Sequence, residues 1–147
     1  MGEAMTTSQA RGFEALCRSS LEDILLEFRY VYRNSYTRCR GVALEFGNNA
    51  NRCFVACEGN AVYMDLILQL APSVFLRVSV NQALWFNGVK TVSQPASVQD
   101  QLVLFGAELR RCCGSILAGD LSALDPRYCF RVSREECHDY VAVLTGC

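Results

Sequence analysis

The chain has 147 residues, of which 51% are hydrophobic and 20% are charged, enough apolar material for one packed domain. Its 14 basic and 15 acidic residues leave a formal net charge of -1, which argues against a nucleic-acid-binding surface, because such surfaces are basic. No apolar run approaches the roughly 20 residues that span a bilayer, so insertion into a membrane is not expected.

Residues 1–8 are polar and predict a flexible lead ahead of a single domain that covers residues 9–147. The lead contains no apolar run, so no secretory signal is expected. Nine cysteines follow, and without a secretory route free thiols are the default. We therefore expect an intracellular protein of the nucleus or the cytoplasm.

A first helix is predicted from residue 9 to about residue 32, where apolar residues recur at helical spacing. Ser20 and Asp23 resemble a capping box, at which this helix would begin or bend. The polar segment 33–40 that follows is expected to be a loop.

The central segment, residues 41–92, predicts a hairpin, a helix and a second hairpin. Two alternating runs around the Asn-rich turn 48–51 give the first hairpin, and the apolar segment 60–71 gives the helix. Alternation over residues 74–80 begins the second hairpin. Asn87-Gly88 closes it, because a type I′ turn needs positive φ at both central residues.

Two more helices and a short strand are predicted in the rest of the chain. Ser97 and Asp100 form a capping box before an apolar stripe over residues 98–116. Residues 128–132 are expected to be a strand, and Ser133 caps a final short helix. We therefore expect an α+β, two-layer fold, in which a mostly antiparallel sheet built from two hairpins has helices packed on one face.

No arrangement of residue types predicts an active site, a cofactor site or a metal site. The sequence has no CxxC motif, and Cys53 and Cys57 would lie about 13 Å apart on one face of a strand, too far for one zinc ion. His138 is the only histidine, and on a helix the adjacent Cys137 would point in another direction. We therefore expect a protein that is not an enzyme. The open alternative is a thiol- or metal-dependent enzyme that uses dispersed cysteines with His138.

Aromatic residues beside turns are the candidates for contact with a partner. Trp85 and Phe86 precede Asn87 at the tip of the second hairpin, and two neighbouring side chains on a strand face opposite sides, so one of them is exposed. Tyr36, in an aromatic cluster after the first helix, and Val74, at the start of the next strand, complete this candidate surface.

One family comparison rests on the order of five short motifs. These are LEDIL at 21–25, GVALEF at 41–46, CFV at 53–55, the segment 61–69 entered through Ala-Val, and the strand 76–80. In this order they resemble the early region 4 open reading frame 3 protein family of adenoviruses, over roughly residues 21–92. The resemblance implies a non-enzymatic viral early protein that dimerises, polymerises in the nucleus and sequesters host factors such as the promyelocytic leukaemia protein.

The chain departs from that family in two places. Where the family has a functionally important Asn after its middle helix, this chain has Pro72, Ser73 and Val74, and it continues over residues 97–147, beyond the family's usual end. No individual functional residue is therefore carried over. The expected function is that of a viral-type accessory protein, a homo-oligomer that sequesters host proteins. A structural subunit of a cellular complex is the remaining alternative.

Overall fold

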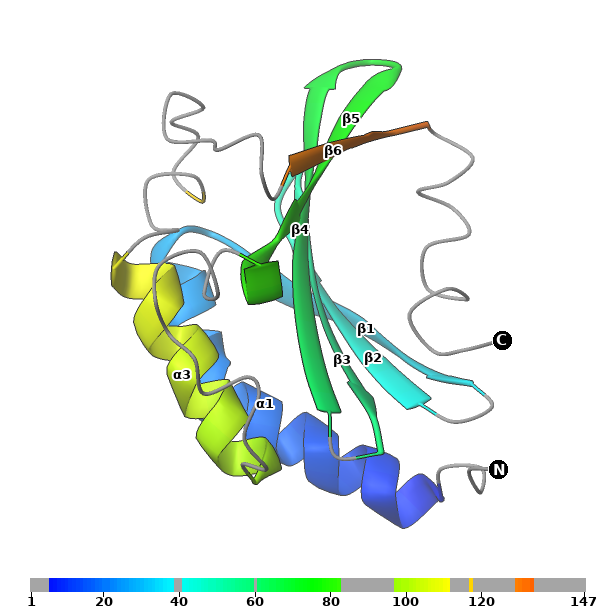
Figure 1. The fold of residues 1–147 in the computed structure, drawn as a ribbon, viewed down its shortest axis with the longest axis vertical. Coiled ribbons are helices and arrows are strands. Elements are labelled where there is room, and N and C mark those ends of the chain that lie inside the picture. The colour runs from blue at the N-terminus through cyan, green and yellow to red at the C-terminus, as the bar shows by residue number, and fades with distance from the viewer. Residues whose placement is uncertain are drawn as a thin grey trace.

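The computed structural model describes residues 6–38, 41–59, 61–82, 97–111, 117 and 129–133. Within them, a six-stranded antiparallel sheet carries helices α1 and α3 together on one of its faces (Figure 1). The strand order is β1-β2-β3-β4-β5-β6, so each strand pairs with the next one along the chain. The predicted α+β fold, with helices on one face of an antiparallel sheet, is confirmed. The elements are α1 Thr7–Glu27, β1 Val31–Arg38, β2 Gly41–Gly47, β3 Arg52–Glu58, β4 Ala61–Ala71, β5 Val74–Ser79, α3 Val98–Arg111 and β6 Cys129–Val132.

Helix α1 begins at a different capping box from the predicted one. The Oγ1 atom of Thr6 accepts a hydrogen bond from the Gln9 amide at 3.1 Å, and the Gln9 side chain accepts one from the Thr6 amide at 2.9 Å. Both bonds satisfy amides that have no partner inside the helix. The segment around Ser20 lies within the helix and does not start it.

The end of α1 and the following strand also differ from prediction. Arg29 adopts a φ of 66°, in the left-handed region, and so turns the chain out of the helix. The predicted loop at 33–40 was wrong, because Val31–Arg38 forms strand β1 at the edge of the sheet. An edge strand can be polar because much of it faces water, and its polarity therefore resembled that of a loop.

The predicted helix at 60–71 was wrong, because this segment forms β4, a central strand. Phe54 of β3 pairs with Asp65 of β4, which pairs in turn with Ser79 of β5. The burial pattern of β4 is nearly continuous, because both of its faces are covered. A short continuous apolar run fits a buried strand and a buried helix equally well.

The main core lies between the helices and the sheet. Helix α1 packs over β1 and β2, and α3 packs over β4. The helices run in the same direction, because Gly106 lies beside Ile24 and Arg110 pairs with Glu27 one turn further on. A Cβ atom at Gly106 would lie 3.0 Å from the Ile24 side chain, so glycine permits this close approach.

The remaining strand predictions are confirmed where the structure describes them. Strands β2, β3, β5 and β6 lie at the expected positions, and the Asp100 amide donates to the Ser97 hydroxyl at 3.1 Å before α3. As predicted, Cys53 and Cys57 share one face of β3, and the structure shows that this face is covered by the helices. The predicted turn at Asn87-Gly88 and the final helix after Ser133 lie outside the described residues.

Candidate functional site

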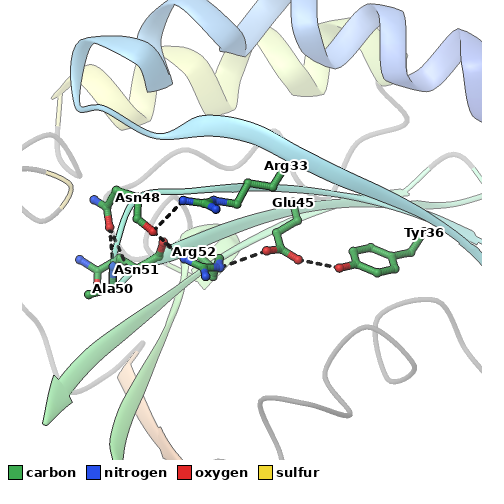
Figure 2. Close-up of polar contacts among 7 residues, drawn as sticks. All are labelled: Arg33, Tyr36, Glu45, Asn48, Ala50, Asn51 and Arg52. Carbon is green, nitrogen blue, oxygen red and sulfur yellow. Dashed lines mark hydrogen bonds and ion pairs between the residues drawn. The ribbon is translucent and has the colours of Figure 1, made fainter. Parts of the chain in front are cut away.

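A chain of polar contacts crosses the outer face of the sheet, which is the face turned away from α1 and α3. Figure 2 shows Tyr36 of β1, Glu45 of β2 and Arg52 of β3 in a row. The Tyr36 hydroxyl donates to one carboxylate oxygen of Glu45 at 2.8 Å, and the Nε atom of Arg52 pairs with the other at 3.0 Å. Both oxygens of Glu45 are therefore occupied.

The turn between β2 and β3, residues 48–51, continues this chain (Figure 2). The Oδ1 atom of Asn48 accepts from the Ala50 and Asn51 amides at 3.2 and 2.9 Å. Two guanidinium groups donate to the carbonyl of Asn48, Arg52 at 2.7 Å and Arg33 at 3.3 Å. These bonds fix the backbone of the turn.

Arg52 reaches the turn by passing over a glycine. A Cβ atom at Gly47 would lie 2.8 Å from Cδ of Arg52 and 2.9 Å from its Nη1. Nη1 also donates to the Asn51 carbonyl at 3.0 Å, and the Asn51 side chain accepts from the Gln69 amide of β4 at 3.0 Å. These hydrogen bonds join the turn to β3 and β4. A larger residue at position 47 would displace the Arg52 side chain.

A cavity of about 580 Å³ lies between this turn and the end of α1. Its walls combine carboxylate, guanidinium and amide groups with two large apolar side chains. The lining residues are Glu27, Phe28, Arg29, Asn48, Asn49, Ala50, Asn51 and Leu117. Cavities of this size commonly hold a small ligand or a side chain of a partner.

A buried hydroxyl lies next to the asparagines of this cavity. Tyr30 is fully buried, and its hydroxyl finds no hydrogen-bond partner in the described structure. Burial raises the pKa of Tyr30 to about 12, and the nearby amides of Asn51 and Asn48 partly oppose that rise. The phenol is therefore protonated at neutral pH and has an unused O–H donor.

Positive charge exceeds negative charge around the cavity. Glu27 is paired with Arg110 at 3.0 Å, whereas Arg29 has no ion-pair partner among the described residues. The Arg33 guanidinium does not line the cavity, but it donates to the carbonyl of Asn48, one of the lining residues. The cavity is therefore rich in hydrogen-bond donors and has a local positive charge.

The buried cysteines are poorly suited to nucleophilic chemistry. Burial raises the pKa of the Cys17 thiol far above its usual value, and Cys57 and Cys53 nearby raise it further. Burial also raises the pKa of Cys57 to about 11. Thiolate is the reactive form, and these thiols are protonated at neutral pH. Cys137 and His138 lie outside the described residues.

The candidate contact residues do not form one surface in the part of the chain that the structure describes. Tyr36 lies on the edge strand β1, where its hydroxyl is bonded to Glu45. Val74 begins β5, four strands away, and is partly buried. Trp85, Phe86 and Asn87 lie outside the described residues.

The cavity residue Arg29 and the neighbouring buried residue Tyr30 were missed by sequence reasoning. The only signal near them was the asparagine-rich run 48–51. It predicted a turn, and the structure has a turn there. No group of three or more His, Cys, Asp or Glu side chains within the described ranges could hold a metal ion. The cavity wall therefore offers amide groups and the Arg29 guanidinium for recognition, and the Tyr30 hydroxyl lies next to Asn48 and Asn51 of that wall.

None of the described helices has both the length and the apolar character needed to cross a membrane. No family model matches the chain, and neither a curated protein nor a solved structure is significantly similar to it. The sheet edges, the outer face and the cavity beside the 48–51 turn are therefore interpreted from their own geometry.

Proposed function

We propose that this chain is a non-enzymatic accessory protein of the viral type, which self-associates and sequesters host proteins in the nucleus or cytoplasm. The observation that carries the proposal is the open sheet. Among the described strands, β1 pairs only with β2, and β6 pairs only with β5. An edge strand presents backbone groups that can pair with another chain.

Exposed apolar side chains support the same proposal, because they provide contact area on both layers of the fold. Large apolar groups at a surface gain free energy when a partner covers them. Among the residues that the structure describes, six large apolar side chains are at least one-third exposed: Leu26, Val31, Tyr63, Leu70, Val103 and Phe130.

The two edges differ in their capacity for pairing. Strand β6 has only four residues, which is too short for an extensive ladder. In β1, a bulge interrupts the register between Tyr32 and Asn34, and the Asn34 side chain accepts a hydrogen bond from the Ser35 amide at 2.9 Å. These features obstruct the first half of β1, so pairing is expected at residues 36–38.

The polar row on the outer face also favours binding over catalysis. A carboxylate acts as a general base when it can reach a proton of the substrate. Glu45 instead directs one oxygen to Arg52 and the other to Tyr36. This pairing supports a structural role for the row, which holds β1, β2 and β3 together beside the proposed edge.

Size-exclusion chromatography with light scattering tests the proposal on the full chain over a range of concentrations. We expect a mass well above the 16.4 kDa of one chain. Thr37→Lys, on the free half of β1, should shift the protein towards the monomer, because an edge lysine opposes strand pairing. The matched control is Ala15→Lys on the exposed side of α1, which should leave the mass unchanged.

Either of two results would contradict this proposal. A mass of one chain at every concentration would contradict the proposed self-association. Equal masses for Thr37→Lys and the unmodified chain would show that the β1 edge is not the surface that pairs.

A further inference from the structure

We infer that the cavity between the end of α1 and the 48–51 turn receives a side-chain carboxylate from an acidic peptide segment of a partner protein. Tyr30, Arg29 and the amides of Asn48 and Asn51 are the recognising groups. This inference rests on the proposed function, because it names the chemistry of a partner that an interaction protein would bind.

The first argument is the unpartnered hydroxyl of Tyr30. Leaving a buried polar group without a hydrogen bond is costly, so native structures rarely do so without a reason. The hydroxyl is fully enclosed and lies beside Asn48 and Asn51, two residues that line the cavity. Tyr30 does not itself line the cavity, so the oxygen that accepts the phenolic proton is one that enters from the cavity between these two amide side chains.

The second argument is that the cavity wall presents side-chain hydrogen-bond donors to a ligand. The Oδ1 atoms of Asn48 and Asn51 already accept backbone amide hydrogens. Their NH₂ donors lie near the Tyr30 hydroxyl, so a ligand oxygen that enters between them meets these donors and the phenol together. Arg29 adds a guanidinium that has no ion-pair partner among the described residues. Together these groups match a carboxylate, which accepts through both oxygens.

The end of α1 does not oppose an anion here as strongly as an open helix end would. The last carbonyls of a helix carry partial negative charge when they are unsatisfied. In α1, the Leu25 carbonyl accepts from the Phe28 and Tyr30 amides, and the Leu26 carbonyl accepts from the Arg29 amide. The single carboxylate in the wall, Glu27, is neutralised by Arg110.

The size and the apolar part of the lining favour a peptide over an inorganic anion. A volume of about 580 Å³ far exceeds that of an isolated carboxylate group. Phe28 and Leu117 provide apolar surface that can cover the methylene groups of a glutamate side chain. We therefore expect the glutamate stem to pack on these residues while its carboxylate meets the donors.

Nuclear magnetic resonance titration of the ¹⁵N-labelled full chain tests this inference. The probes are the blocked dipeptide Ac-Glu-Glu-NH₂ and its uncharged counterpart Ac-Gln-Gln-NH₂. We expect the acidic peptide to shift the side-chain amide signals of Asn48, Asn49 and Asn51 saturably. The uncharged peptide should bind about tenfold more weakly, because it loses the charge-assisted bonds.

Two variants separate recognition by these residues from general attraction to a cation. Arg29→Gln should weaken binding of Ac-Glu-Glu-NH₂ about tenfold. Arg11→Gln removes the same charge from an exposed position near the other end of α1 and should leave the affinity unchanged. Equal losses in both variants would overturn the inference.

Tyr30→Phe gives two readouts of opposite sign. It should weaken binding of Ac-Glu-Glu-NH₂ several-fold and, without peptide, raise the melting temperature, because it removes an unpartnered buried hydroxyl. A lower melting temperature would show that an internal group or water already satisfies this hydroxyl, and would overturn its role.

Equal binding of both dipeptides, or binding of neither, would also overturn the inference. Light scattering on the same samples separates this failure from failure of the proposed function. Self-association through β1 can persist whether or not the cavity binds an acidic peptide.

Discussion

The two faces of the sheet are both buried at their centres, but different residue types produce that burial. The face under α1 and α3 is apolar at its centre, with residues such as Leu44, Met64 and Leu66 fully buried. The outer face combines buried Phe54 and Ile67 with polar groups, including the paired Glu45. Stability on the first face thus depends on packing, and on the second face it depends also on whether each polar group has its partner.

Deleting a side chain from the helix-covered face should have the largest effect. Leu66→Ala should lower the free energy of unfolding by about 2–5 kcal/mol, because it removes a fully buried side chain and leaves a cavity. Urea denaturation measures this change. Leu70→Ala on the same strand is the matched control, since Leu70 is 41% exposed and its truncation should cost less than about 1 kcal/mol. Similar losses in the two variants would contradict the distinction.

Removing the central carboxylate of the outer face should have an intermediate effect. Glu45→Ala should cost about 2 kcal/mol in urea denaturation, because it leaves Arg52 and the Tyr36 hydroxyl without their partner. Glu22→Ala is the control. It breaks the exposed pair with Arg18, and such surface pairs contribute about 0.2–1 kcal/mol. Equal losses of stability in the two variants would show that Glu45 contributes no more than an exposed ion pair does.

Raising the pH should have the smallest effect on the free energy of unfolding. The effect should come from the Cys57 thiol, which lies on the helix-covered face. The pKa of Cys57 is raised from 9.0 to about 11 in the folded state, so the unfolded chain loses its proton first as pH rises. The folded state binds more protons in this window, and stability therefore falls with pH, by about 1 kcal/mol for this thiol between pH 8 and 10. Replacing Cys57 with Ala should flatten that slope. An unchanged slope would exclude this thiol as its source.

Sequence reasoning succeeded where one face of an element was clearly apolar. The alternation in β2, β3 and β5 and the Ser97 cap of α3 identified those elements because local pattern and tertiary burial agree there. It failed for β4, which is buried on both faces, and for the polar edge strand β1. In both cases, the position of the strand within the sheet decided its composition.

The candidate site could be predicted only in part. Tyr36 was identified as an aromatic contact residue, but its bond to Glu45 depends on the register of β1 against β2. The cavity was not foreseen, because it is assembled from the end of α1, the 48–51 turn and Leu117. Residues so distant in sequence share a cavity only after the helix has docked on the sheet.

The simple strand order has a consequence for how the chain acquires its structure. Strands β1 to β5 pair in sequence order within residues 31–79, so each pairing closes only a short loop and costs little chain entropy. We expect this part of the sheet to form by successive zipping, even during synthesis on the ribosome. Strand β6 must wait for the α3 segment that precedes it, which makes its addition the last step in assembly of the described sheet.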